Sequence, residues 1–208
     1  MKSLNRTIIL ILFFALPAFA GSGIEGIHNF RQVNDRVYRG GQPTSEGFKY
    51  LAKIGVKTVL DLREDDSRSL AEKEAVTALG MQFVSVPMSG LTPPTGAQIT
   101  KILSLLEDTN EGPVFVHCRR GADRTGAVIA AYRIDHDHWD NVRALKEAMS
   151  DGMSFFQLPR QSFIRNFQPR TIAAATVAKS DSAESKTPAA VPQPAVTPAV
   201  AVAAPAVN

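Results

Sequence analysis

The fold of this chain is decided by the stretch VFVHCRRGADRTG, residues 114–126. A short apolar strand is predicted over 113–116 and a largely apolar helix over 125–134, so the polar residues between them form a turn. In α/β folds with parallel sheets, ligands bind beyond the carboxyl ends of the strands. This turn is therefore the place where a functional site is expected.

Strands and helices alternate on the amino-terminal side of this stretch. Glycines and prolines separate the segments, and β-branched residues mark the strands, most clearly in VKTVLDL at 56–62. Strands are expected over 37–39, 56–62, 81–86 and 113–116, and helices over 45–54, 69–79, 95–107, 125–134 and 142–149. This order predicts an α/β fold with a central, largely parallel sheet flanked by helices.

Both ends of the chain differ in composition from its middle. Residues 1–20 have Lys2 and Arg6 before a short apolar run that closes with Ala-Phe-Ala, which is typical of a secretory signal peptide. Residues 171–208 are rich in Ala, Val and Pro, and we expect a disordered tail, either passive or a tether. The folded domain is predicted over 24–170. The mature chain is expected in the periplasm, or secreted, with no stable membrane span.

Charge and cysteine content exclude several classes of protein. The net charge of the 208 residues is +3, and Lys2 and Arg6 in the predicted signal account for two of these charges, so nucleic acid is not an expected partner. The single cysteine, Cys118, cannot form an intramolecular disulfide or a multi-thiolate zinc site. We expect no metal and no cofactor.

Cys118 and Arg124 frame a predicted phosphate cradle. The backbone N–H groups of a tight loop can converge on one anion, and the N-terminus of the following helix adds positive potential. Gly121 permits the curvature, and Arg124 offers a planar fork to two phosphate oxygens. The same field lowers the pKa of a cysteine, which makes Cys118 a candidate nucleophile, and Thr125 can donate a hydrogen bond to its sulfur. The phosphate-binding candidates are Arg119, Arg120, Gly121, Ala122, Asp123 and Arg124, with His117 and Gly126 supporting the loop.

The motif His-Cys-x5-Arg-Thr-Gly at 117–126 resembles the signature of the protein tyrosine phosphatase superfamily. The longer patterns VYRGGQP at 37–43 and GVKTVLDLR at 55–63 look like its small dual-specificity branch, including bacterial members and the atypical plant and fungal enzymes. The resemblance covers about residues 29–152. It implies the compact phosphatase fold, Cys118 as nucleophile, Arg124 as the transition-state clamp and no metal. Rhodanese and arsenate-reductase loops fit the motif less well.

The sequence departs from the family pattern at the general acid. Members of the superfamily normally supply an Asp from the loop after the strand that is predicted to end near Val86, but residues 87–94 contain no carboxylate. Asp123 is the first candidate for the missing acid, and Asp61, Asp65 and Asp66 are the next. The alternative is an acid-deficient pseudophosphatase that binds phosphate groups without turnover.

The expected substrates carry several negative charges or an aromatic phosphate. Arg119 and Arg120 suit a phosphotyrosine protein or a highly phosphorylated small molecule, such as the inositol polyphosphates used by related atypical phosphatases and phosphatase-like phytases. Arg39 is a further candidate for the pocket. Arg160 and Arg165 could line the same pocket, but an ordinary surface position is the default expectation for both. The pair Phe155-Phe156 is expected to pack in the core or to cover a helix.

Overall fold

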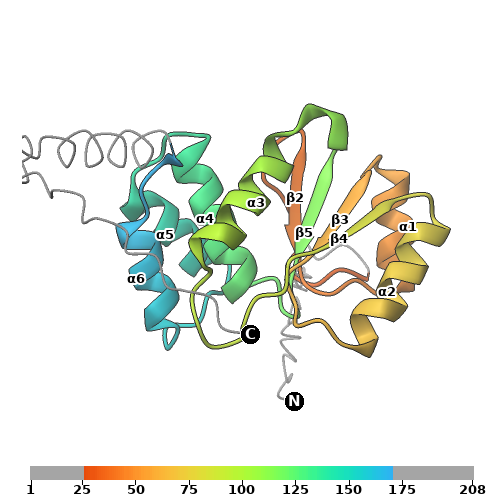
Figure 1. Cartoon of the computed structure of the whole chain (residues 1–208), viewed down its shortest axis with the longest axis horizontal. Helices are drawn as coiled ribbons and strands as arrows, with labels where there is room; N and C mark the ends of the chain where they lie inside the picture. Colours follow the sequence, from red (N-terminus) through yellow and green to blue (C-terminus); the bar gives the residue numbers. More distant parts are fainter. Residues whose placement is uncertain (1–25, 171–208) are drawn as a thin grey trace, which may run out of the picture. The chain divides into compact units, whose positions relative to one another are not determined.

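The structure is a computed structural model that describes residues 26–170. The predicted signal peptide and C-terminal tail lie outside these residues. The described part contains one five-stranded sheet with the order β1-β2-β5-β3-β4 (Figure 1). Its strands are β1 (Arg31–Gln32), β2 (Val37–Gly40), β3 (Thr58–Asp61), β4 (Gln82–Ser85) and β5 (Val114–His117). Only β1 runs antiparallel to its neighbour, which confirms the largely parallel sheet.

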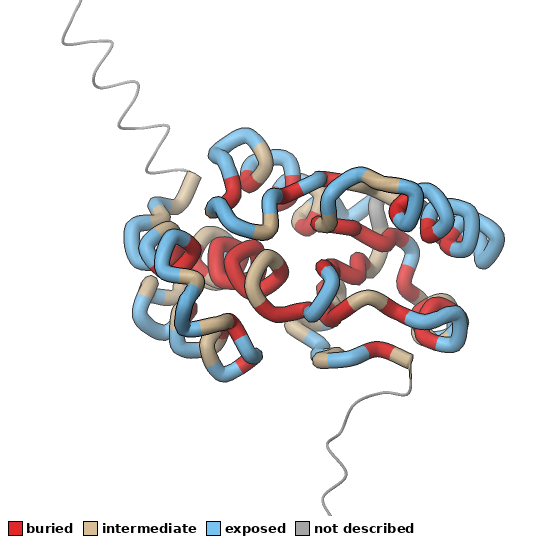
Figure 2. The backbone as a smooth tube through the Cα atoms, turned by 90° about the horizontal axis from the view of Figure 1, so that it is seen from below, coloured by how far each residue is buried: buried red, intermediate tan, exposed pale blue. Residues whose placement is uncertain are grey.

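Helices cover both faces of the sheet (Figure 1). One face carries α1 (Ser45–Lys53) and α2 (Ser67–Ala78). The other carries α3 (Gly96–Glu107) and α4 (Asp123–Asp135), with α5 (Asn141–Ser150) and α6 (Leu158–Asn166) packed beyond α4. Figure 2 shows the buried residues running through the middle of this arrangement and the exposed residues on the outer turns of the helices.

The central strand β5 contributes to two hydrophobic cores because its side chains alternate between the two faces. Val114 and Val116 pack with residues of α3 and α4, including Ile102 and Val128. Phe115 points the other way and packs with Phe48, Leu51 and Val76 of α1 and α2. Both faces of β5 are thus buried, which fixes the position of the residues that follow it.

The helices begin where the sequence places capping residues. Thr44, Asp66, Thr95 and Asp140 each accept a hydrogen bond from a backbone N–H in the first turn of α1, α2, α3 and α5. The sequence does not predict β1 or α6, because a two-residue strand and a helix that starts at Leu158-Pro159 have no clear periodicity. No helix in residues 26–170 is long and apolar enough to cross a membrane.

Candidate active site

The turn after β5 and the first turn of α4 surround a pocket of about 200 Å³. The residues that line it are Gly90, Cys118, Arg119, Arg120, Asp123 and Arg124. Three of the six are arginines, and the N-terminus of α4 opens onto the same space, so the pocket is suited to an anion. Cys118 lies at its base and is 3% exposed.

The surroundings of Cys118 favour its thiolate form. Burial, the largest effect, raises the pKa of the thiol. The hydroxyl and the backbone N–H of Thr125, the charge of Arg124 and the backbone N–H of Arg120 act in the opposite direction, and together they hold the pKa of Cys118 below its ordinary value. Apart from this contact, the buried Thr125 hydroxyl has no hydrogen-bond partner in the described residues. These contacts therefore favour the thiolate, which is the nucleophilic form of cysteine.

Glycine is required at position 121. Its φ is +69°, in the left-handed region, and a Cβ there would overlap the backbone of Gly40 and Gly41. The loop thus lies directly against the end of β2. At Gly126, on the buried side of α4, a Cβ would stand 3.2 Å from Met153. Gly126 therefore lets α4 pack closely against the segment that follows α5.

Arg39 supports the loop from behind and does not line the pocket, which corrects its predicted position. Its side chain is buried, donates a hydrogen bond to the carbonyl of Gly121, and pairs through Nη1 with Asp151 Oδ2 at 2.7 Å. Asn29 also donates to the Gly121 carbonyl, at 3.0 Å. The physical reason is the pleat of β2, which directs Arg39 beneath the loop and toward a buried carboxylate.

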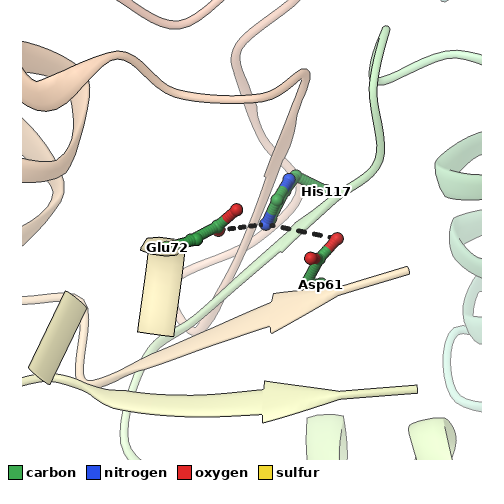
Figure 3. Close-up of side chains that lie close together, drawn as sticks. All are labelled: Asp61, Glu72 and His117. Carbon is green, nitrogen blue, oxygen red and sulfur yellow. Dashed lines mark ion pairs between the residues drawn. The ribbon is translucent and has the colours of Figure 1, made fainter. Parts of the chain in front are cut away.

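His117, the residue before Cys118, lies in a second buried cluster. Its Nε2 is 2.8 Å from Oε1 of Glu72 and 3.9 Å from Oδ1 of Asp61 (Figure 3). Arg63 completes the cluster with ion pairs to Asp61 at 2.8 Å and Glu72 at 2.6 Å. These contacts tie the residue before Cys118 to β3 and α2, in agreement with a loop-supporting role.

The cluster does not have the geometry of a tetrahedral zinc site, although Asp61, Glu72 and His117 place three ligand atoms within 4.8 Å of one another. Donors on one tetrahedral zinc ion stand about 3.3 Å apart, because each metal–ligand distance is about 2.0–2.1 Å. The 2.8 Å between His117 and Glu72 is too short for this arrangement. Arg63 contacts both carboxylates and occupies the side of the cluster that a metal ion would share with them.

Two carboxylates pair with arginines of the pocket. Glu64 Oε2 lies 2.7 Å from Nη1 of Arg124, which also donates to the Met88 carbonyl at 3.2 Å. Asp123 pairs with Arg120 through Oδ2 and accepts a hydrogen bond from the backbone N–H of Ser154 at 2.8 Å through Oδ1. The pocket arginines are therefore partly neutralised by side chains at the pocket mouth.

A family model described as "DSP-PTPase phosphatase fused to NAD+ Kinase" matches residues 22–166. The chain belongs to this family of phosphatases. It is 29% identical over 136 residues to the dual specificity protein phosphatase TpbA of Pseudomonas aeruginosa, which covers 65% of this chain and 60% of TpbA. It is 31% identical over 114 residues to the inositol diphosphatase DSP5 of Arabidopsis thaliana, which covers 50% of this chain and 53% of DSP5. The chain thus spans less than two thirds of these relatives.

Solved structures of phosphatases have the same fold. The chain resembles P. aeruginosa TpbA with a TM-score of 0.61 at 24% identity, over 73% of this chain and 96% of TpbA. It resembles the core catalytic domain of the PP-IP phosphatase SIW14 from S. cerevisiae with a TM-score of 0.62 at 24% identity, over 76% of this chain and 96% of that domain. This agreement confirms the predicted phosphatase fold.

In this phosphatase-family chain, the loop at 87–94 is held in place by a residue that the sequence analysis placed at the surface. Arg160 of α6 is buried and donates hydrogen bonds to the carbonyls of Ser89 at 2.5 Å and Gly90 at 3.1 Å. It therefore positions one wall of the pocket. Arg165 donates to Gln161 and does not line the pocket.

Several predicted acids have other roles in the structure. Asp61 is buried against Arg63, Asp66 caps α2 and pairs with Arg68, and Asp65 lines a separate surface pocket beside Lys73. Phe155 and Phe156 are 69% and 83% exposed, so the expectation that they pack in the core is wrong. Their segment is fixed by backbone contacts to Asp123 and Gln161, which leave the rings in solvent.

Proposed function

We propose that this protein hydrolyses phosphate monoesters through a phosphocysteine intermediate on Cys118. The observation that carries the proposal is the low-pKa thiol at the base of a pocket lined by three arginines. A thiolate, an anion cradle and a guanidinium fork are the parts that an in-line displacement at phosphorus needs. Membership of the phosphatase family supports the same chemistry.

In the first step the Cys118 thiolate attacks phosphorus, a sulfur–phosphorus bond forms, and the bond to the leaving oxygen breaks. Arg124 and the backbone N–H groups of 119–124 bind the equatorial oxygens, and the leaving oxygen takes a proton. In the second step water attacks phosphorus and loses a proton, and phosphate leaves the sulfur. Thr125 stabilises the departing thiolate.

We propose phosphotyrosine proteins or highly phosphorylated small molecules as substrates. Arg119 and Arg120 both belong to the pocket lining, and the Arg120 side chain is 58% exposed, so additional phosphate or carboxylate groups can reach these residues. The relatives include a dual specificity protein phosphatase and an inositol diphosphatase, and a variant of TpbA has been crystallised in complex with pTyr. We further propose that the mature chain acts in the periplasm or is secreted, which fractionation of expressing cells tests.

The deciding experiment is phosphate release from para-nitrophenyl phosphate, phosphotyrosine peptide, phosphoserine peptide and inositol hexakisphosphate. We expect turnover by the wild-type chain, inhibition by vanadate, and loss of turnover in Cys118→Ser. Wild-type protein that binds vanadate but releases no phosphate from any of the four would instead establish the pseudophosphatase alternative, which the absence of a carboxylate at 87–94 favours.

A further inference from the structure

The first step needs a proton donor for the leaving oxygen, and two carboxylates contact the arginines of the pocket. Asp123 pairs with Arg120, and Glu64 pairs with Arg124. An alkoxide or phenoxide leaves slowly unless it is protonated, so one of these groups is expected to act as an acid when the substrate is bound.

Asp123 is held by partners that the substrate need not displace. The Ser154 N–H that contacts its Oδ1 belongs to the backbone, and Arg120 contacts its Oδ2 from the same turn. The Asp123 side chain is 14% exposed and is held between these two donors. A phosphate group bound in the pocket therefore leaves the position and the partners of Asp123 unchanged.

Glu64 pairs with Arg124, and the phosphate group of a substrate must bind the same arginine. It lies in the turn between β3 and α2, its side chain is 57% exposed, and its Oε2 contacts Arg124 at 2.7 Å. The Gly90 N–H also donates to this carboxylate, so Glu64 bridges α4 and the loop at 87–94. A phosphate oxygen bound to the same Nη1 atom lies at most about 6 Å from Glu64, given the usual length of an N–H···O hydrogen bond.

We propose that Glu64 is the general acid of the reaction, in place of an acid on the 87–94 loop. This inference rests on the proposed phosphatase function. The Glu64 carboxyl gives its proton to the leaving oxygen as the phosphorus–oxygen bond breaks and Cys118 becomes phosphorylated. The resulting Glu64 carboxylate then takes a proton from the attacking water, which forms inorganic phosphate and releases the Cys118 thiolate. Glu64 is thereby returned to its protonated form.

The charges around Glu64 explain how substrate binding would prepare it. Partial burial, the largest effect, raises the pKa of Glu64, but hydrogen bonds from its own backbone N–H, Arg124 and Gly90 hold the pKa below its ordinary value. Arg68 and Arg160 also interact electrostatically with Glu64. When a phosphate dianion occupies Arg124, Glu64 loses this partner and gains a negative neighbour. Both changes raise its pKa toward the range of a working acid.

The test compares two substrates whose leaving groups differ in basicity. Para-nitrophenolate is a stable anion that leaves without protonation, whereas the phenoxide of phosphotyrosine has a pKa of about 10 and requires an acid. We would measure kcat and KM for both substrates across pH in wild type, Glu64→Gln, Asp123→Asn and the matched control Asp65→Asn, whose carboxylate is exposed and lies outside the pocket lining.

We expect Glu64→Gln to lower kcat on phosphotyrosine about 100-fold and on para-nitrophenyl phosphate less than tenfold, the range of general acid catalysis. The alkaline decline of kcat on phosphotyrosine should disappear, and Asp65→Asn should match wild type. The proposal would be overturned if Glu64→Gln lost activity equally on both substrates, or if its kcat/KM rose on both. It would also be overturned if Asp123→Asn, rather than Glu64→Gln, lost activity on phosphotyrosine alone. Retained activity of Glu64→Gln on para-nitrophenyl phosphate shows that the phosphatase function stands whichever acid is used. If the wild-type chain turned over neither substrate, both the general-acid proposal and the proposed phosphatase function would be wrong.

Discussion

The loop at 117–124 has two sides with different kinds of ion pairs. Beneath it, Arg39 pairs with Asp151 and holds the Gly121 carbonyl, and these side chains are almost fully buried. At its mouth, Glu64 and Arg120 are the more exposed members of the pairs with Arg124 and Asp123. Breaking a buried pair leaves an uncompensated charge, whereas exposed pairs exchange with solvent and ligands at small cost.

The buried ion pairs beneath the loop and the more exposed ion pairs at its mouth therefore have different roles. The buried pairs keep the backbone N–H groups in position before any ligand arrives, so the cradle is already formed. The exposed pairs place carboxylates where phosphate groups would bind, and a substrate has to replace them. Variants beneath the loop should therefore change stability, and variants at the mouth should change kinetics.

The largest effect is expected at the mouth, for Arg124→Ala. Loss of the guanidinium that clamps the transferring group should lower kcat/KM by about 10³-fold or more, as for other arginines that stabilise phosphoryl transfer. The melting temperature should stay close to that of wild type, because the partner Glu64 is largely exposed. Steady-state kinetics and thermal unfolding of the same preparation check both parts, and a large loss of stability would contradict the division between the two sides.

Beneath the loop, Asp151→Ala should reduce the free energy of unfolding by about 3–5 kcal/mol, because it leaves the buried guanidinium of Arg39 without its carboxylate partner. Urea denaturation measures this change. The matched control is Asp35→Ala, an exposed carboxylate for which a change within about 0.5 kcal/mol is expected. Similar stabilities for the two variants would show that the buried pair does not organise the loop.

Thr125→Ala should shift the pH dependence of the reaction. The pKa of Cys118 is held below its ordinary value, so the thiolate extends to lower pH than in an ordinary cysteine, and kcat/KM should decline as the pH falls through this lowered pKa. Removing the Thr125 hydroxyl takes away a hydrogen bond that lowers the pKa of Cys118, so the acid limb should move to higher pH. Thr125→Ser keeps the hydroxyl and should retain the wild-type limb; an unchanged limb in Thr125→Ala would contradict the assignment.

A small effect on stability, less than about 1 kcal/mol, is expected for Arg120→Ala, because the Arg120 member of this ion pair is exposed. Its KM for inositol hexakisphosphate should rise more than its KM for para-nitrophenyl phosphate, since only the former has further phosphates for Arg120 to bind. Equal KM changes for the two compounds would show that Arg120 binds only the phosphate group that is transferred, which would contradict this prediction.

The parts of the fold and site that the sequence predicts are local. The strand–loop–helix at 113–134 carries its own apolar pattern, glycine and helix start, and the family resemblance extends this to the whole sheet. Arg39, Arg160 and Glu64 could not be placed this way, because their partners lie 112, 71 and 60 positions away in the chain. The sequence presents Asp61, Asp65 and Asp66 as candidate acids, yet Glu64 in the same turn contacts Arg124, because side-chain direction in a turn depends on tertiary packing.

The central claim, nucleophilic catalysis by Cys118, is tested most directly by acid-quenching the enzyme during turnover of para-nitrophenyl phosphate and mapping modified peptides by mass spectrometry. The account predicts one added phosphoryl group on the peptide that contains Cys118, and no modified peptide in Cys118→Ser. Continued hydrolysis by Cys118→Ser, or a phosphoryl group on any other residue, would contradict it.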